Sequence, residues 1–267
     1  MTRAGDRPTD ITAPSPVTKD DKMNADRPIP FRRLLAVEAR KLVDTRSGVI
    51  IALVMVGLVA ASVVARGVVV GPKLQTLVGT AGIALGTLLP VLGILTVTGE
   101  WAHRTALTTF VLEPRRHRVV AAKCLPPLLA AVALSLFAVL VAVPATAVVS
   151  GVQKPAVWEV QPLALLGWTG GNVLVAAAGL ALGALLLNAP AAIVINFSTP
   201  VLWAVVGRLD SAGATLAEWL DLGTTAAPLT SGDMTWSEGA RLATSVAFWI
   251  AVPLAAGLVR VLRKEVT

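Results

Sequence analysis

Long uncharged runs, separated by charged segments, dominate the pattern of hydrophobic and polar positions along the chain. These runs cover 48–65, 74–99, 124–153, 160–207 and 242–259. A helix of about 20 apolar residues crosses the hydrocarbon core of a bilayer, which is about 30 Å thick. The pattern therefore predicts an all-α, polytopic membrane protein.

The run 160–207 is too long for one span. As a single helix it would extend roughly 72 Å at about 1.5 Å per residue, more than twice the membrane thickness. Asn188-Ala189-Pro190 is the expected break, because proline lacks an amide donor and clashes with the preceding turn. The sequence thus predicts spans at about 48–65, 74–99, 128–149, 163–187, 190–207 and 242–259, which makes six transmembrane helices.

The part before the first span divides in two. Residues 1–29 hold few large apolar residues, which predicts a disordered cytoplasmic tail, and 30–267 is expected to form a single transmembrane domain. From 30 to 47, apolar residues recur at helical spacing on one face: Phe31, Leu34, Leu35 and Leu42. Glu38 lies on the same face. This amphipathic helix either lies in the membrane interface or packs on the ends of the spans.

The placement of Lys and Arg predicts the orientation, because cytoplasmic loops carry an excess of basic residues. One side has Arg32, Arg33, Arg40, Lys41, Arg46, Arg104, Arg115, Arg116, Arg118, Lys123, Arg260, Arg263 and Lys264; the other has Arg66, Lys73, Lys154, Arg208 and Arg241. Both termini are therefore expected in the cytoplasm. The outer loop 209–239 is expected to hold a short helix with Leu216, Trp219 and Leu220 on one face.

Composition supports a membrane protein. Of 267 residues, 55% are hydrophobic and 15% are charged, whereas a soluble domain carries about a quarter charged residues. The net charge of +7 is explained by basic residues facing anionic lipid headgroups, so no nucleic-acid partner is expected. The single cysteine, Cys124, excludes an internal disulfide and a cysteine metal cluster.

Catalytic motifs are missing from the sequence. It has no G-x-x-x-x-G-K-[ST], no H-E-x-x-H and no G-x-S-x-G. The predicted spans hold no ionisable side chain, which disfavours direct coupling to a proton or sodium gradient. His103 and His117 match no metal motif. We therefore expect no enzymatic activity, no metal site and no cofactor bound by this chain.

Small and weakly polar residues mark the spans instead. Gly79, Gly82 and Gly86, and the pair Gly179 and Gly183, allow close helix approach, either within one subunit or between subunits. Candidate pathway residues are Asn172, Asn196, Ser198 and Thr199, which either line a translocation path or satisfy one another across helices.

The segment between spans two and three is too structured for a simple turn. Residues 101–112 make about three helical turns, roughly 18 Å. Pro114 prevents continuation, a basic cluster follows at headgroup level, and a helix restarts over 119–123. A rigid helix held between two spans can transmit force, so this segment is expected to contact a soluble partner.

This segment carries a resemblance to a known family. The run Gly99-Glu100-Trp101, Thr105, Leu112-x-Pro114-Arg115-Arg116-x-Arg118 and Lys123 resembles the loop between spans two and three in bacterial ABC-2 type transporter permeases. Residues 34–42 are similar to the amphipathic helix that precedes span one in that family. Arg104 stands where many members have glycine.

The resemblance implies a coupling helix that contacts a separate cytoplasmic ABC ATPase subunit, which would bind ATP and Mg. The implied contact residues are Glu100, Trp101, Arg104, Thr105, Leu112, Pro114, Arg115, Arg116, Arg118 and Lys123. It also implies a second permease subunit, identical or different, and export across a bacterial plasma membrane. The alternative is a six-span membrane scaffold or regulatory anchor of another complex. A membrane enzyme is disfavoured.

Overall fold

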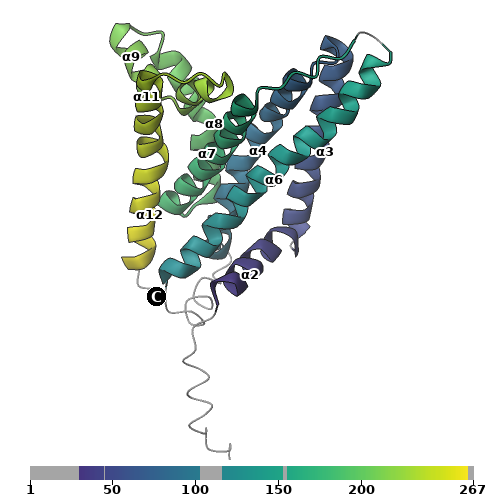
Figure 1. The fold of residues 1–267 in the computed structure, drawn as a ribbon. Coiled ribbons are helices and arrows are strands. Elements are labelled where there is room, and N and C mark those ends of the chain that lie inside the picture. Colours follow the sequence, from purple (N-terminus) through teal and green to yellow (C-terminus); the bar gives the residue numbers. More distant parts are fainter. Residues whose placement is uncertain (1–29, 45, 103–115, 153–154, 264–267) are drawn as a thin grey trace, which may run out of the picture.

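The computed structural model describes residues 30–44, 46–102, 116–152 and 155–263, and long helices dominate them (Figure 1). In chain order these are α3 (Arg46–Val70), α4 (Leu74–Ala102), α6 (Arg116–Ser150), α7 (Pro162–Leu186) and α8 (Ala189–Val206), followed by a run made of α11 (Trp236–Val246), η2 (Ala247–Ala251) and α12 (Val252–Arg263). Six stretches are long and apolar enough to cross a membrane. The predicted all-α polytopic fold is confirmed. The predicted tail, 1–29, lies outside the described residues.

Shorter helices mark the two ends of the bundle. The amphipathic helix α2 (Phe31–Asp44) lies at the end of the bundle where α12 also ends, and we call this the α2 end (Figure 1). At the opposite end, the α9 end, lie α9 (Ser211–Leu220), α10 (Leu222–Ala226) and η1 (Ala227–Thr230). Asp210 caps α9, because its carboxylate accepts a hydrogen bond from the Gly213 amide at 2.6 Å. The short helix expected in the loop 209–239 is confirmed.

The helices α4 and α7 form the centre of the bundle. In their most apolar stretches 56% and 50% of the residues are buried, against 11% for α8. Their backbones come into direct contact: a methyl group at Gly93 would lie 2.7 Å from the Ala176 carbonyl oxygen, and one at Gly179 would overlap Pro90. Such close approach is how small residues hold membrane helices together. The G-x-x-x-G pair at Gly179 and Gly183 thus serves packing within this chain.

Side chains fill the rest of the core between α4 and its neighbours. The main cluster joins α3, α4, α6 and α7, and includes Met55, Val59, Val63, Leu77, Leu85, Leu89, Ala131, Ala138 and Ala176. Buried residues recur every three or four positions in α3 and α4, as a helix that presents one face to a neighbour requires. The remaining faces of α3 and α6 are exposed and apolar.

The predicted break between spans four and five is confirmed. Leu187 adopts the left-handed conformation, with φ 51°, and its amide bonds the Gly183 carbonyl oxygen. Asn188 then caps α8, because its side-chain oxygen accepts a hydrogen bond from the Ala191 amide at 3.1 Å. Pro190 stands in the first turn of α8, where its missing N–H has no intrahelical partner to lose.

Two helix starts differ from the predicted span limits. The third membrane helix begins at Arg116, close to the helix restart expected over 119–123 but well before the span limit at 128, and it continues through Pro126 and Pro127. The last one begins at Trp236 rather than 242, because Thr235 and Glu238 form a reciprocal capping box that starts the helix before the uncharged run. Charged residues therefore mark the end of an uncharged run, but the helix continues through them.

A π-helical turn, η2, precedes Pro253 in the last membrane helix. Proline clashes with the carbonyl four residues earlier in a regular α-helix, and a wider turn relieves this clash. The clash at Pro253 is thus accommodated over residues 247–251.

Candidate functional site

The predicted partner-contact residues cluster in sequence around the connection from α4 to α6. Glu100 and Trp101 belong to the last turn of α4, and Arg116 is the first residue of α6. Both helices reach the α2 end there (Figure 1). Arg104, Thr105, Leu112, Pro114 and Arg115, and most of the predicted helix 101–112, lie outside the described residues. The side-chain geometry of this site is therefore described at Arg118, which is half-buried, and at Lys123.

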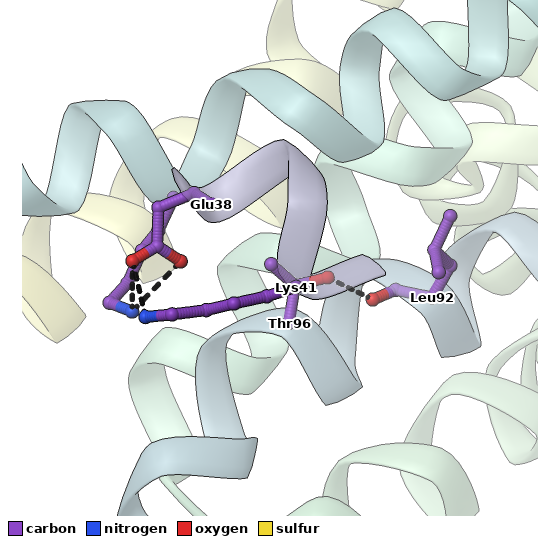
Figure 2. A network of polar contacts seen from close by, with 5 residues as sticks. Glu38, Lys41, Leu92 and Thr96 are labelled. Atoms are coloured by element: carbon purple, nitrogen blue, oxygen red, sulfur yellow. Dashed lines mark hydrogen bonds and ion pairs between the residues drawn. The ribbon is translucent and has the colours of Figure 1, made fainter. Parts of the chain in front are cut away.

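Lys123 forms a buried ion pair with Glu38 of α2. Its Nζ lies 3.1 Å from Glu38 Oε2 and 3.2 Å from Oε1, so it bridges both carboxylate oxygens. The two side chains are only 9% and 7% exposed. Lys41 of α2 donates to the same carboxylate, with its Nζ 2.7 Å from Oε1 (Figure 2). One carboxylate thus holds two ammonium groups, one of them on a different helix.

The amphipathic sequence of α2 explains why Glu38 is turned inward. Leu34, Leu35 and Leu42 are half-buried on the same face as Glu38, while Arg40 and Asp44 form an exposed ion pair at 3.6 Å on the other face. The helix packs against α6 and α3. The helix α2 therefore packs on the ends of the spans, which does not conflict with a position in the membrane interface.

Sequence reasoning did not assign a role to Glu38, although a signal was present. A carboxylate at the centre of an apolar helix face requires a partner when the face is buried, because an unpaired buried charge is very unfavourable. The partner lies 85 residues away in the chain. Only the packing of α2 on α6 identifies it.

A second polar contact joins helix ends at the same end of the bundle. Arg260 of α12 donates from Nη1 to the Leu185 carbonyl oxygen at 2.7 Å. The last carbonyls of a helix lack intrahelical partners, and a cation there is also favoured by the helix dipole. Arg260 therefore ties the last membrane helix to the end of α7.

Two threonines of α4 near this end satisfy their hydroxyl groups within the helix. Thr96 donates to the Leu92 carbonyl oxygen at 2.7 Å (Figure 2), and Thr98 donates to that of Ile94 at 2.8 Å. Because both hydroxyl groups donate to backbone carbonyls, neither is free to donate a hydrogen bond to a ligand.

The predicted pathway residues occupy two different settings. Asn172 is buried in α7, and its amide donates to the Ser135 hydroxyl of α6 at 3.0 Å. Asn196, Ser198 and Thr199 lie on α8, where Ser198 is exposed and Thr199 bonds the Ile195 carbonyl oxygen. Within the described residues no hydrogen bond joins Asn172 to these three. Asn172 is thus satisfied across helices, but by Ser135.

A cavity of about 220 Å³ lies near the α9 end, between the first turns of α4 and α7. Its lining is mostly apolar: Gln75, Val78, Gly79, Val160, Ala164, Leu165, Trp168 and Thr230. A methyl group at Gly79 would meet no atom within 4 Å, so this glycine borders open space rather than a helix.

Comparison with protein-family models gives no match for this chain, and comparison with curated proteins gives none either. In the described part of the chain, no three His, Cys, Asp or Glu side chains are grouped so that they could hold a metal ion. The fold and its side chains therefore define the protein as a multi-pass helical membrane protein.

Proposed function

We propose that this protein is the permease subunit of an ATP-binding-cassette transporter, with its α2 end and both termini in the cytoplasm of a bacterial cell. One observation carries the proposal: the last turn of α4 and the first turns of α6, which belong to the segment 100–123, lie at the α2 end. That segment has the sequence that resembles the ATPase-contacting loop of ABC-2 type permeases. The basic residues of α2 at the same end agree with a cytoplasmic location.

The composition of the chain supports a division of labour between subunits. The sequence has apolar spans and no phosphate-binding loop, so a separate cytoplasmic ATPase would bind ATP and Mg and supply the energy. A second permease subunit, identical or different, would complete the translocation pathway. The direction that the family resemblance implies is export.

Purification with the native partner tests this proposal. Tagged protein is extracted into lipid nanodiscs from membranes of the cell that makes it, and ATP hydrolysis by the preparation is measured. We expect an ATPase with a phosphate-binding loop in the complex, and loss of that subunit in the double variant Glu100→Ala, Leu112→Asp. Glu218→Ala, at the exposed α9 end, serves as the matched control and should retain it.

Two outcomes would refute the proposal. ATP hydrolysis or transport by this chain without a partner would show that no separate ATPase subunit supplies the energy. A complex whose transport is unaffected by the double variant would favour a six-span scaffold or regulatory anchor.

A further inference from the structure

We infer that Glu38 is a positioning residue that makes α2 move together with the first turns of α6. The buried pair of Glu38 and Lys123 is the link. The mechanical link stands on the structure alone. Its role in transport rests on the proposed function, because it would carry displacement of the segment 100–123 to α2.

The position of Lys123 makes this link effective. It lies seven residues after Arg116, the start of α6, which is about 10 Å or two helical turns along the axis. The segment proposed to contact the ATPase ends at Lys123 itself. A force applied before α6 therefore reaches Lys123 through an unbroken helix.

A weak point in α6 follows immediately. Pro126 and Pro127 have no amide hydrogen, so the carbonyls of Ala122 and Lys123 lose their usual partners four residues on. Helices bend most readily at such places. The first turns of α6 can thus tilt relative to the rest of that helix, while Lys123 stays on the side joined to α2.

The other end of the link leads into the first membrane helix. Only residue 45 separates α2 from α3, and α2 also packs against α3. Leu42 of α2 contacts the main apolar cluster of the bundle. A displacement of α2 therefore reaches α3 both through the chain and through side-chain packing.

The chemistry of the pair suits a device that fixes position. Buried ion pairs are often no more stabilising than apolar residues of the same size, but they require one geometry and strongly disfavour loss of one partner. Lys123 contacts both carboxylate oxygens, and Lys41 holds one of them from the side. The two contacts of Lys123 thus set the rotation of α2 against α6, while Lys41, on α2 itself, holds the carboxylate in place.

Hydrogen exchange of the isolated protein in lipid nanodiscs tests the link without any ATPase. In Glu38→Gln, which keeps the size of the side chain, we expect amide exchange to rise about tenfold or more in both α2 and residues 116–125, with α7 unchanged. Asp44→Asn breaks an exposed ion pair on the same helix and is the matched control. The charge-swapped double variant Glu38→Lys, Lys123→Glu still places one carboxylate beside two ammonium groups, that of Lys41 and the new one at position 38, and should restore slow exchange.

The inference is wrong if amide exchange in Glu38→Gln stays at the wild-type rate, or if it rises in α2 but not in residues 116–125. A uniform rise over the whole bundle would show a general structural role and would equally refute it. If Glu38→Gln does not fold, the double swap alone decides: its two segments must exchange as slowly as in the wild type.

The transport role has its own readout in the purified complex. Glu38→Gln should lower the amount transported per ATP hydrolysed at least several-fold, and both Asp44→Asn and the double swap should keep the wild-type ratio. A wild-type ratio in Glu38→Gln would refute the transport role. A wild-type protein that binds no ATPase would refute the proposed function and leave the exchange result standing.

Discussion

Glycine decides how closely the central helices α4 and α7 approach. At Gly93 an added methyl group would lie 2.7 Å from the Ala176 carbonyl oxygen and 2.8 Å from the Leu180 nitrogen, and at Gly179 it would overlap the backbone of Pro90. Backbone atoms cannot swing away as a side chain can. Gly86 of α4 differs, because a methyl group there would meet nothing within 4 Å.

This contrast gives a prediction at the residue scale. Gly179→Ala should lower the free energy of unfolding by about 1–3 kcal/mol, because the extra methyl group forces two backbones apart. Gly86→Ala should leave it unchanged or raise it by up to about 1 kcal/mol, since alanine is the better helix former. Unfolding in mixed detergent micelles measures both. Equal stability of the two variants would contradict the direct contact of α4 and α7.

Burial distinguishes two carboxylates of α2, Asp44 and Glu38. Asp44 pairs with Arg40 in the open, where an ion pair contributes little. Glu38 pairs with Lys123 in the interior, where loss of either partner leaves a charge without compensation. The same chemistry thus has different consequences at positions 38 and 44.

At the scale of elements, helix ends are fixed by local polar contacts. Asn188 and Leu187 close the gap between α7 and α8, Arg260 bonds the end of α7, and the capping box of Thr235 and Glu238 starts α11. Each contact supplies a partner for a backbone group that the helix itself leaves without one. These contacts hold the turns between membrane helices in one geometry.

The predicted helix 101–112 gives a prediction about coupling. Pro114→Ala would let that helix continue toward α6, because alanine restores the amide donor and removes the clash. We expect ATP hydrolysis by the complex to persist while the amount transported per ATP falls several-fold. Simultaneous assays of phosphate release and transport in proteoliposomes measure this ratio. An unchanged ratio would argue against force transmission through this segment.

Much of the element order follows from the sequence. Uncharged runs placed all six membrane helices, and Asn188-Ala189-Pro190 placed the break after α7, because lipid excludes charge and proline interrupts a helix. The predicted span limits at 128 and 242 lie inside longer helices, and α6 begins close to the helix restart expected over 119–123. Lys123 and Arg241 bound the uncharged runs that begin at 124 and 242, but the helices begin earlier, at Arg116 and Trp236.

The contacts between distant helices could not be predicted in this way. Glu38 and Lys123, or Asn172 and Ser135, are brought together by the packing of whole helices, and no local pattern encodes which residues will face each other. For the candidate site, the sequence identified Lys123 but not the carboxylate that holds it. The predicted contacts within 103–115 stay predictions.

At the scale of the whole molecule, the outward faces are apolar. On α8 the exposed large residues are Val194, Ile195, Phe197, Val201, Leu202 and Val205. The faces of α3 and α6 are similar, with Leu53 and Leu140 exposed. Such surfaces are stable against lipid chains or against another apolar helix, as a multi-pass membrane protein requires.

The orientation of the molecule can be measured directly. In a Cys124→Ala background, Ser231→Cys at the α9 end should react with a membrane-impermeant maleimide in intact cells. Arg40→Cys on α2 should react only after the membrane is made permeable, because the excess of Lys and Arg keeps the α2 end inside. Both positions are exposed, so burial does not explain a difference. The reverse labelling pattern would contradict the proposed topology.

Two kinds of packing occur in the bundle, backbone against backbone around α7 and side chain against side chain elsewhere. Alongside α4, α7 also meets α12 without intervening side chains, because a methyl group at Gly257 would lie 2.6 Å from the Ala184 carbonyl carbon. We therefore expect α4, α7 and α12 to move as one rigid unit. Between α4 and α3 or α6 lie leucine, valine and methionine side chains such as Met55 and Leu85, which can change rotamer. We expect relative motion between helices to be largest at this side-chain interface of α4 with α3 and α6.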